Sequence, residues 1–102
     1  MSRTIDISPE ALAIVSSILR THLPAGTRAW VFGSRATGGA RRYSDLDLAL
    51  EADEPISADH LAAVATELSE SDLPFMADVL DLRTIEPRFR ALIEPDMVPL
   101  PF

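Results

Sequence analysis

The stretch most informative about the architecture reads GSRATGGARRYSDLDL and spans residues 33–48. It begins with Gly33 and Ser34, directly after an apolar segment that predicts a strand over residues 28–32. Ten residues further on come Asp45 and Asp47, which alternate with leucines. Alternation of polar and apolar residues over residues 44–50 predicts a second strand with one buried face. Residues 33–48 therefore join two neighbouring strands and carry polar residues at both ends.

Asp45 and Asp47 are the candidate metal ligands. Because they stand two residues apart on the predicted strand, both carboxylates leave the same face, with Cα atoms about 7 Å apart. Two carboxylates that close repel each other unless a cation lies between them, and hard oxygen ligands suit Mg²⁺ or Mn²⁺. A half-exposed strand without any site shows the same alternation, so the pair alone leaves that alternative open. A calcium loop is excluded, because the further oxygen ligands and the glycine of such a loop are missing.

Gly33 and Ser34 are the candidate phosphate-binding residues. A glycine after a strand, followed by a hydroxyl residue at a helix start, lets backbone N–H groups and the serine hydroxyl converge on phosphate oxygens. Four arginines lie within fifteen residues around this pair, namely Arg28, Arg35, Arg41 and Arg42. A local basic pocket in an acidic protein suits a small phosphate ligand, although solvated surface arginines give the same pattern.

The rest of the chain predicts helices and strands in the order α-β-β-α-β-α. A first helix is expected after Ser8 and a second after Ser57, because serine is a favoured N-cap residue. A third strand is expected over residues 75–82, and a last helix from Pro87 that buries Phe89, Leu92 and Ile93. Residues 96–102 can form an edge strand, although two prolines weaken that prediction. The order indicates an α/β (α+β) domain on a small mixed sheet.

Composition restricts the class of protein. The 102 residues are 47% hydrophobic and 25% charged, which predicts one globular domain over residues 1–102. The absence of cysteine excludes disulfides and cysteine zinc sites, and it fits a reducing compartment. No apolar run is long enough to cross a bilayer, and the N-terminus has no apolar signal core. A cytoplasmic protein that does not contact membranes is therefore expected.

The net charge of −7 is unevenly distributed along the chain. Residues 1–50 contain six arginines and four acids, a charge of +2, whereas residues 51–102 contain three arginines and twelve acids, a charge of −9. Because nucleic-acid phosphates repel an acidic chain, no non-specific binding of nucleic acid is expected.

The pattern Gly33-Ser34, ten residues, Asp45-x-Asp47 resembles the motif of the minimal nucleotidyltransferase (MNT) domains of the DNA polymerase β superfamily. Residues 32–36 and 44–48 match that motif without a gap, and the likeness in kind extends from the first predicted helix to the last. The resemblance implies a polymerase-β-type nucleotidyltransferase fold, with helices packed on one face of the sheet. It also implies a third carboxylate from a later strand.

Asp78 and Asp81 are both candidates for the third carboxylate. Their parities on the predicted strand differ, so only one of them can share a face with the site. The family pattern favours Asp78, and Asp81 would then end the strand as a turn or capping residue.

The resemblance implies transfer of a nucleoside monophosphate from ATP to an acceptor hydroxyl, with release of pyrophosphate. In the two-metal scheme Asp45 and Asp47 hold both Mg²⁺ ions, and Asp78 completes the second site and can serve as the base. The implied nucleotide-binding residues are Gly33, Ser34, Arg35 and Ser44, of which the first three would contact the β- and γ-phosphates.

Stand-alone MNT proteins are paired with a HEPN-domain protein as a toxin–antitoxin system. The resemblance therefore implies an antitoxin that adenylylates a tyrosine of its HEPN toxin. Two alternatives stay open. One is an antitoxin that neutralises its partner by contact alone, with a vestigial nucleotide site. The other is a small-molecule nucleotidyltransferase of the aminoglycoside type, which the lack of an acceptor domain disfavours.

Overall fold

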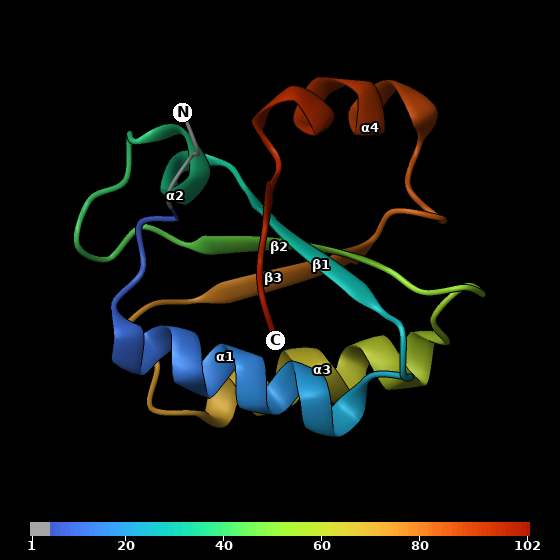
Figure 1. The fold of residues 1–102 in the computed structure, drawn as a ribbon, viewed down its shortest axis with the longest axis horizontal. Coiled ribbons are helices and arrows are strands. Elements are labelled where there is room, and N and C mark those ends of the chain that lie inside the picture. The colour runs from blue at the N-terminus through green and yellow to red at the C-terminus, as the bar shows by residue number, and fades with distance from the viewer. Residues whose placement is uncertain (1–4) are drawn as a thin grey trace.

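The computed structural model describes residues 5–102 and contains one four-stranded sheet with helices on both faces (Figure 1). In chain order the elements are α1 (Pro9–His22), β1 (Arg28–Phe32), α2 (Ser34–Thr37), β2 (Leu46–Glu51), α3 (Ala58–Glu70), β3 (Ala77–Asp81), α4 (Pro87–Ile93), the 3-10 helix η1 (Glu94–Asp96) and β4 (Val98–Pro99). The predicted order of the main elements is confirmed, and α2 and η1 are short additions to it.

The sheet is mixed, as the sequence predicts, with the strand order β3-β2-β1-β4. β1 pairs antiparallel with β2 and with β4, whereas β2 and β3 are parallel. Parallel neighbours need a crossover connection, which α3 supplies between β2 and β3. β4 contains Pro99 and lies at the edge of the sheet, where a strand tolerates a residue without an N–H group.

The two long helices, α1 and α3, lie together on one face of the sheet (Figure 1). Both are capped as predicted, since Ser8 Oγ accepts a hydrogen bond from Ala11 N and Ser57 Oγ accepts one from His60 N, each at 3.1 Å. The main core forms between these helices and the sheet, and its fully buried members include Val15, Leu19, Val31, Leu46, Leu48, Leu50 and Val64. Burial of these apolar side chains is the main force that holds the layers together.

The opposite face of the sheet carries a smaller apolar cluster and leaves room for polar residues. Trp30 and Phe32 of β1 pack there against a buried cluster formed by Ala49, Leu82 and Ile93, the last of these on α4. The last helix therefore lies on the face opposite α1 and α3, rather than beside them (Figure 1). No helix between residues 5 and 102 combines the length and apolarity needed to span a membrane.

The prediction that α4 buries Phe89 and Leu92 is wrong, because these side chains are 42% and 71% exposed. Only Ile93 of this helix is buried. A helix of seven residues makes little contact with the sheet, and here that contact is made at its C-terminal end. An apolar stripe therefore does not by itself fix how much of a short terminal helix is covered.

Candidate active site

The glycine after β1 lies against the second aspartate of the motif. Gly33 has φ +75°, a conformation that only glycine adopts readily, and it is the N-cap residue of α2. A Cβ atom added at this position would lie 2.4 Å from Oδ2 of Asp47. The Asp47 carboxylate therefore occupies the space that a side chain at position 33 would take, and the two halves of the Gly-Ser and Asp-x-Asp motif lie against each other.

Asp47 lies between polar and aromatic neighbours on the face opposite α1 and α3. In the register of the sheet, Asp47 pairs with Phe32 of β1 on one side and with Asp78 of β3 on the other. The leucines on either side of Asp47 point into the main core, as the alternation predicts. Paired residues on adjacent strands project from the same face, so the carboxylates of Asp47 and Asp78 share one face.

The three acids interact electrostatically. Burial raises the pKa of the Asp47 carboxyl above its ordinary value, and the negative charges of Asp78 and then Asp45 raise it further. Among residues 5–102, no arginine or histidine forms an ion pair with any of these three carboxylates. Since like charges at close range disfavour ionisation, such a group of acids is the arrangement that a cation stabilises.

The donor set fits a hard divalent ion. Carboxylate oxygens are the protein ligands that Mg²⁺ prefers, and this ion needs only one or two of them when substrate phosphates and water complete its shell. Within residues 5–102, no group of three or more acidic, histidine or cysteine side chains converges closely enough to hold an ion by itself.

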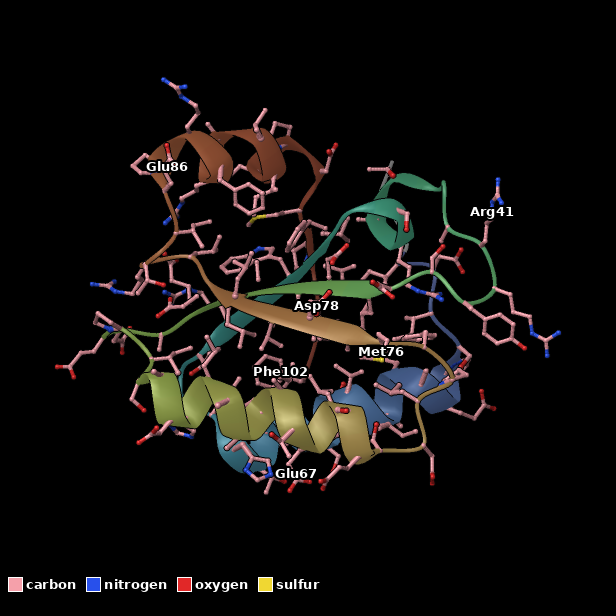
Figure 2. All side chains as sticks on the ribbon, turned by 180° about the vertical axis from the view of Figure 1, so that it is seen from behind. Arg41, Glu67, Met76, Asp78, Glu86 and Phe102 are labelled. Atoms are coloured by element: carbon pink, nitrogen blue, oxygen red, sulfur yellow. The ribbon has the colours of Figure 1, made fainter. Side chains whose placement is uncertain are left out.

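The two candidates for the third carboxylate lie on opposite faces of β3. Asp78 is exposed, and Figure 2 shows it on the side of β3 that faces away from α1 and α3. Asp81 is 1% exposed, and its carboxylate accepts hydrogen bonds from Ile56 N at 2.9 Å and from Arg83 N at 3.0 Å. Asp81 thus ties the end of β3 to the segment before α3, whereas Asp78 lies beside Asp47.

The serines of the motif lie at the two ends of the loop that contains Arg41 and Arg42. Ser34 is the first residue of α2, where the first N–H groups of a helix have no intrahelical acceptor. Ser44 lies just before β2, and its hydroxyl accepts a hydrogen bond from Arg41 N at 2.8 Å. Ser44 therefore shapes the turn that leads into Asp45, whereas Ser34 lies in the first turn of α2, next to Gly33.

Arg35 lies inside the protein, although the sequence predicts it beside the phosphates. It is 5% exposed, and its guanidinium donates hydrogen bonds to three backbone carbonyls. The ring of Phe75 lies 3.9 Å from its guanidinium carbon. Sequence reasoning did not single out Phe75, and an aromatic residue next to a strand gives no signal of such a contact.

Comparison with known proteins finds a matching family and a similar protein. The chain matches the family described as "Polymerase beta, Nucleotidyltransferase" over residues 15–96. It is 45% identical over 89 residues to a protein of Haemophilus influenzae named "Probable protein adenylyltransferase MntA", and the match covers 87% of this chain and 77% of that protein.

Solved structures of similar fold come from toxin–antitoxin complexes. A chain from the crystal structure of a toxin–antitoxin with AMP-PNP superposes with a TM-score of 0.73 at 24% identity, covering 87% of this chain and 71% of that one. A chain from the complex of a tri-AMPylated Shewanella oneidensis HEPN toxin with its MNT antitoxin gives a TM-score of 0.69 at 22% identity, covering 89% and 69%. At these identities the likeness shows a shared fold. From the family match and the 45% identical relative, we conclude that this chain belongs to the polymerase beta nucleotidyltransferase family.

Proposed function

We propose that this chain is an adenylyltransferase that transfers AMP from ATP to a tyrosine hydroxyl of a HEPN-domain toxin. It thereby acts as the antitoxin of that toxin. The observation that carries the proposal is the placement of Asp78 opposite Asp47, with the backbone of Gly33 against the Asp47 carboxylate. Contact between the Gly33 turn and the acids supports a site that holds phosphates next to a metal ion.

In this proposal Asp45 and Asp47 bind Mg²⁺, and Asp78 completes the ligand set. Bound Mg²⁺ ions supply charge stabilisation of the triphosphate and lower the pKa of the attacking hydroxyl. The Gly33 turn and Ser34 hold the β- and γ-phosphates, whose charge increases as pyrophosphate leaves. Ser44 contributes by shaping the turn before Asp45.

The reaction is a displacement at the α-phosphorus. The acceptor oxygen forms a bond to this phosphorus, the bond to the bridging oxygen of pyrophosphate breaks, and the hydroxyl proton passes to a base. Asp78 is suited to that role because it is exposed on β3 beside Asp47 and forms no ion pair among residues 5–102.

A protein acceptor is supported by the comparisons and by the charge of the chain. The relative at 45% identity is named a protein adenylyltransferase, and a structural neighbour was solved with an AMPylated HEPN toxin. Residues 51–102 carry a net charge of −9, which favours association with a basic partner. A cytoplasmic location remains a prediction from the sequence.

The direct test is incubation of the chain with its HEPN partner, ATP and Mg²⁺, followed by intact-mass spectrometry. With the wild-type chain, the mass of the partner should rise by one or more AMP units. With the Asp45→Asn variant, the mass of the partner should stay unchanged. Asp72→Asn, which changes an exposed acid outside the site, is the matched control and should transfer as the wild type does.

A cell assay separates catalysis from neutralisation by contact. If Asp45→Asn protects cells from the partner as well as the wild type does, contact alone neutralises the toxin. Loss of protection with unchanged binding of the partner supports the enzymatic role.

A further inference from the structure

We propose that Arg35 is a positioning residue that holds the phosphate-binding turn and the acidic strand in fixed relation, and that it does not contact the nucleotide. The importance of this role for catalysis rests on the proposed function. The inference itself starts from the surroundings of the Arg35 side chain.

Each of the three nitrogens of the Arg35 guanidinium donates a hydrogen bond to a backbone carbonyl. Nε donates to Ser44 O at 2.9 Å, Nη1 donates to Asp6 O at 2.8 Å and Nη2 donates to Arg42 O at 3.1 Å. No carboxylate among residues 5–102 pairs with it. A buried charge is tolerated only when such polar partners replace its hydration, so Arg35 cannot turn toward a ligand without losing them.

These contacts join the segments that carry the site. Arg35 itself lies on α2, two residues after Gly33, and Ser44 immediately precedes Asp45. The ring of Phe75, stacked on the guanidinium, lies three residues before Asp78 on the segment that leads into β3. One side chain thus connects the phosphate-binding turn to the starts of both strands that supply the acids.

The N-terminal segment is held by a reciprocal pair of hydrogen bonds. Asp6 N donates to Arg35 O at 2.8 Å, while the guanidinium of Arg35 donates to Asp6 O. Residues 5–8, before α1, are therefore held against α2 through Asp6. The chain between α2 and Ser44 is mostly exposed, and Figure 2 shows Arg41 on this outlying loop. The pairing of β1 with β2 places Gly33 beside Asp47. The contacts of Arg35 add a second connection at Ser44, immediately before Asp45, where the exposed loop alone offers little support.

The geometry requires arginine rather than a positive charge alone. The three carbonyls accept hydrogen bonds from three different nitrogens of one planar group, and the face of that group contacts Phe75. Lysine offers donors from a single nitrogen and has no planar face to stack. Arg35→Lys therefore keeps the charge and loses most of the connection.

The test compares Arg35→Lys with Arg88→Lys, an exposed substitution on α4 that serves as control. Four quantities are measured on each protein: thermal unfolding, hydrogen exchange of residues 41–46, affinities for Mn²⁺, ATP and AMP, and the rate of AMP transfer. For Arg35→Lys we expect faster exchange over residues 41–46, weaker Mn²⁺ binding, and a kcat lower by about tenfold to 100-fold. Its affinity for ATP should fall together with its affinity for Mn²⁺, because one side chain holds both the turn and the start of the acidic strand.

Two outcomes would overturn the proposal, and a third separates it from the proposed function. If Arg35→Lys weakens ATP binding but leaves AMP binding and Mn²⁺ binding unchanged, Arg35 contacts the phosphates and the proposal is wrong. If the folded variant has the hydrogen-exchange rates, the Mn²⁺ affinity and the kcat of the wild type, the positioning role is also wrong. If the wild type itself transfers no AMP, the proposed function fails, while exchange and Mn²⁺ binding still test Arg35.

Phe75→Leu covers the case in which Arg35→Lys does not fold. It removes the stacked ring and leaves the three carbonyl contacts in place. A smaller loss of kcat and of Mn²⁺ affinity, in the same direction, is expected. Unchanged values for both would contradict the proposal.

Discussion

Asp78 stands directly opposite Asp47 in the parallel pairing of β3 with β2. The two residues are separated in sequence by the whole of α3, yet they share one face of the sheet. Side chains alternate between the two faces of a strand. A residue two positions from Asp78 on β3 would therefore lie on the same face as Asp47, whereas a residue one position from Asp78 would lie on the opposite face. The pairing therefore determines which acid of β3 can act with Asp45 and Asp47.

Asp78→Asn should abolish AMP transfer and leave the fold intact. The side chain is exposed, so its substitution has little effect on the free energy of unfolding. Loss of a base or of a metal ligand lowers the rate by about 100-fold or more. Steady-state transfer rates and thermal unfolding curves of the variant, measured side by side with the wild type, check both statements.

Asp81→Asn is the matched comparison and should give the opposite result. Its buried carboxylate accepts N–H groups from Ile56 and Arg83, and an amide can replace only one of the two acceptor oxygens. We expect a loss of about 1–3 kcal/mol in the free energy of unfolding, with the transfer rate per folded molecule retained. An inactive but stable Asp81→Asn protein would show that the third carboxylate is misassigned.

Asp47→Asn should stabilise the metal-free protein at neutral pH. Burial and the charges of Asp78 and Asp45 raise the pKa of Asp47 in the folded state, so the folded protein binds this proton more tightly than the unfolded chain. The wild type therefore loses stability as pH rises through the folded-state pKa, and asparagine removes that loss.

Thermal unfolding in the presence of a chelator measures the effect. The Asp47→Asn protein should have the higher Tm at pH 7, and the difference should shrink as pH falls below the ordinary pKa of aspartate. Added Mg²⁺ should raise the Tm of the wild type more than that of the variant. A wild type that is the more stable protein at pH 7 without metal would contradict the electrostatic account of the site.

Gly33→Ala should damage both stability and activity. The substitution puts a side chain at a positive φ and a Cβ atom 2.4 Å from the Asp47 carboxylate. The backbone conformation alone costs about 1–3 kcal/mol, and displacement of Asp47 should lower the transfer rate further. Gly39→Ala is the control, since a Cβ atom there meets nothing within 4 Å. Equal effects of the two substitutions on stability and transfer rate would contradict the role of Gly33 in the proposed site.

The alternation of residues 44–48 predicts which side of β2 carries Asp47, and Asp45 immediately precedes the strand. Period-2 patterning assigns faces directly, and Leu46 and Leu48 are fully buried on the side opposite Asp47. The same parity separated Asp78 from Asp81, and their contacts differ accordingly. For these residues the local sequence predicts the face on which each side chain lies, because successive side chains of a strand alternate between its two faces.

Sequence could not predict the environment of Arg35 or the exposure of α4. The carbonyls around Arg35 come from segments near residues 6 and 42–44, and their approach depends on tertiary packing. Likewise, Phe89 and Leu92 follow a helical apolar spacing, but the helix contacts the sheet mainly through Ile93. Periodicity identifies an apolar side of a helix and does not show how much of it a neighbouring element covers.

The most direct test of the central claim, that the acids bind a nucleotide through a divalent ion, is calorimetric titration of ATP into the metal-free protein with and without Mg²⁺. Affinity should be at least about tenfold higher with Mg²⁺, because the ion relieves repulsion between the triphosphate and the three carboxylates. Asp47→Asn should lose most of this metal dependence. Equal affinity of the wild type for ATP with Mg²⁺ and with a chelator would contradict the account.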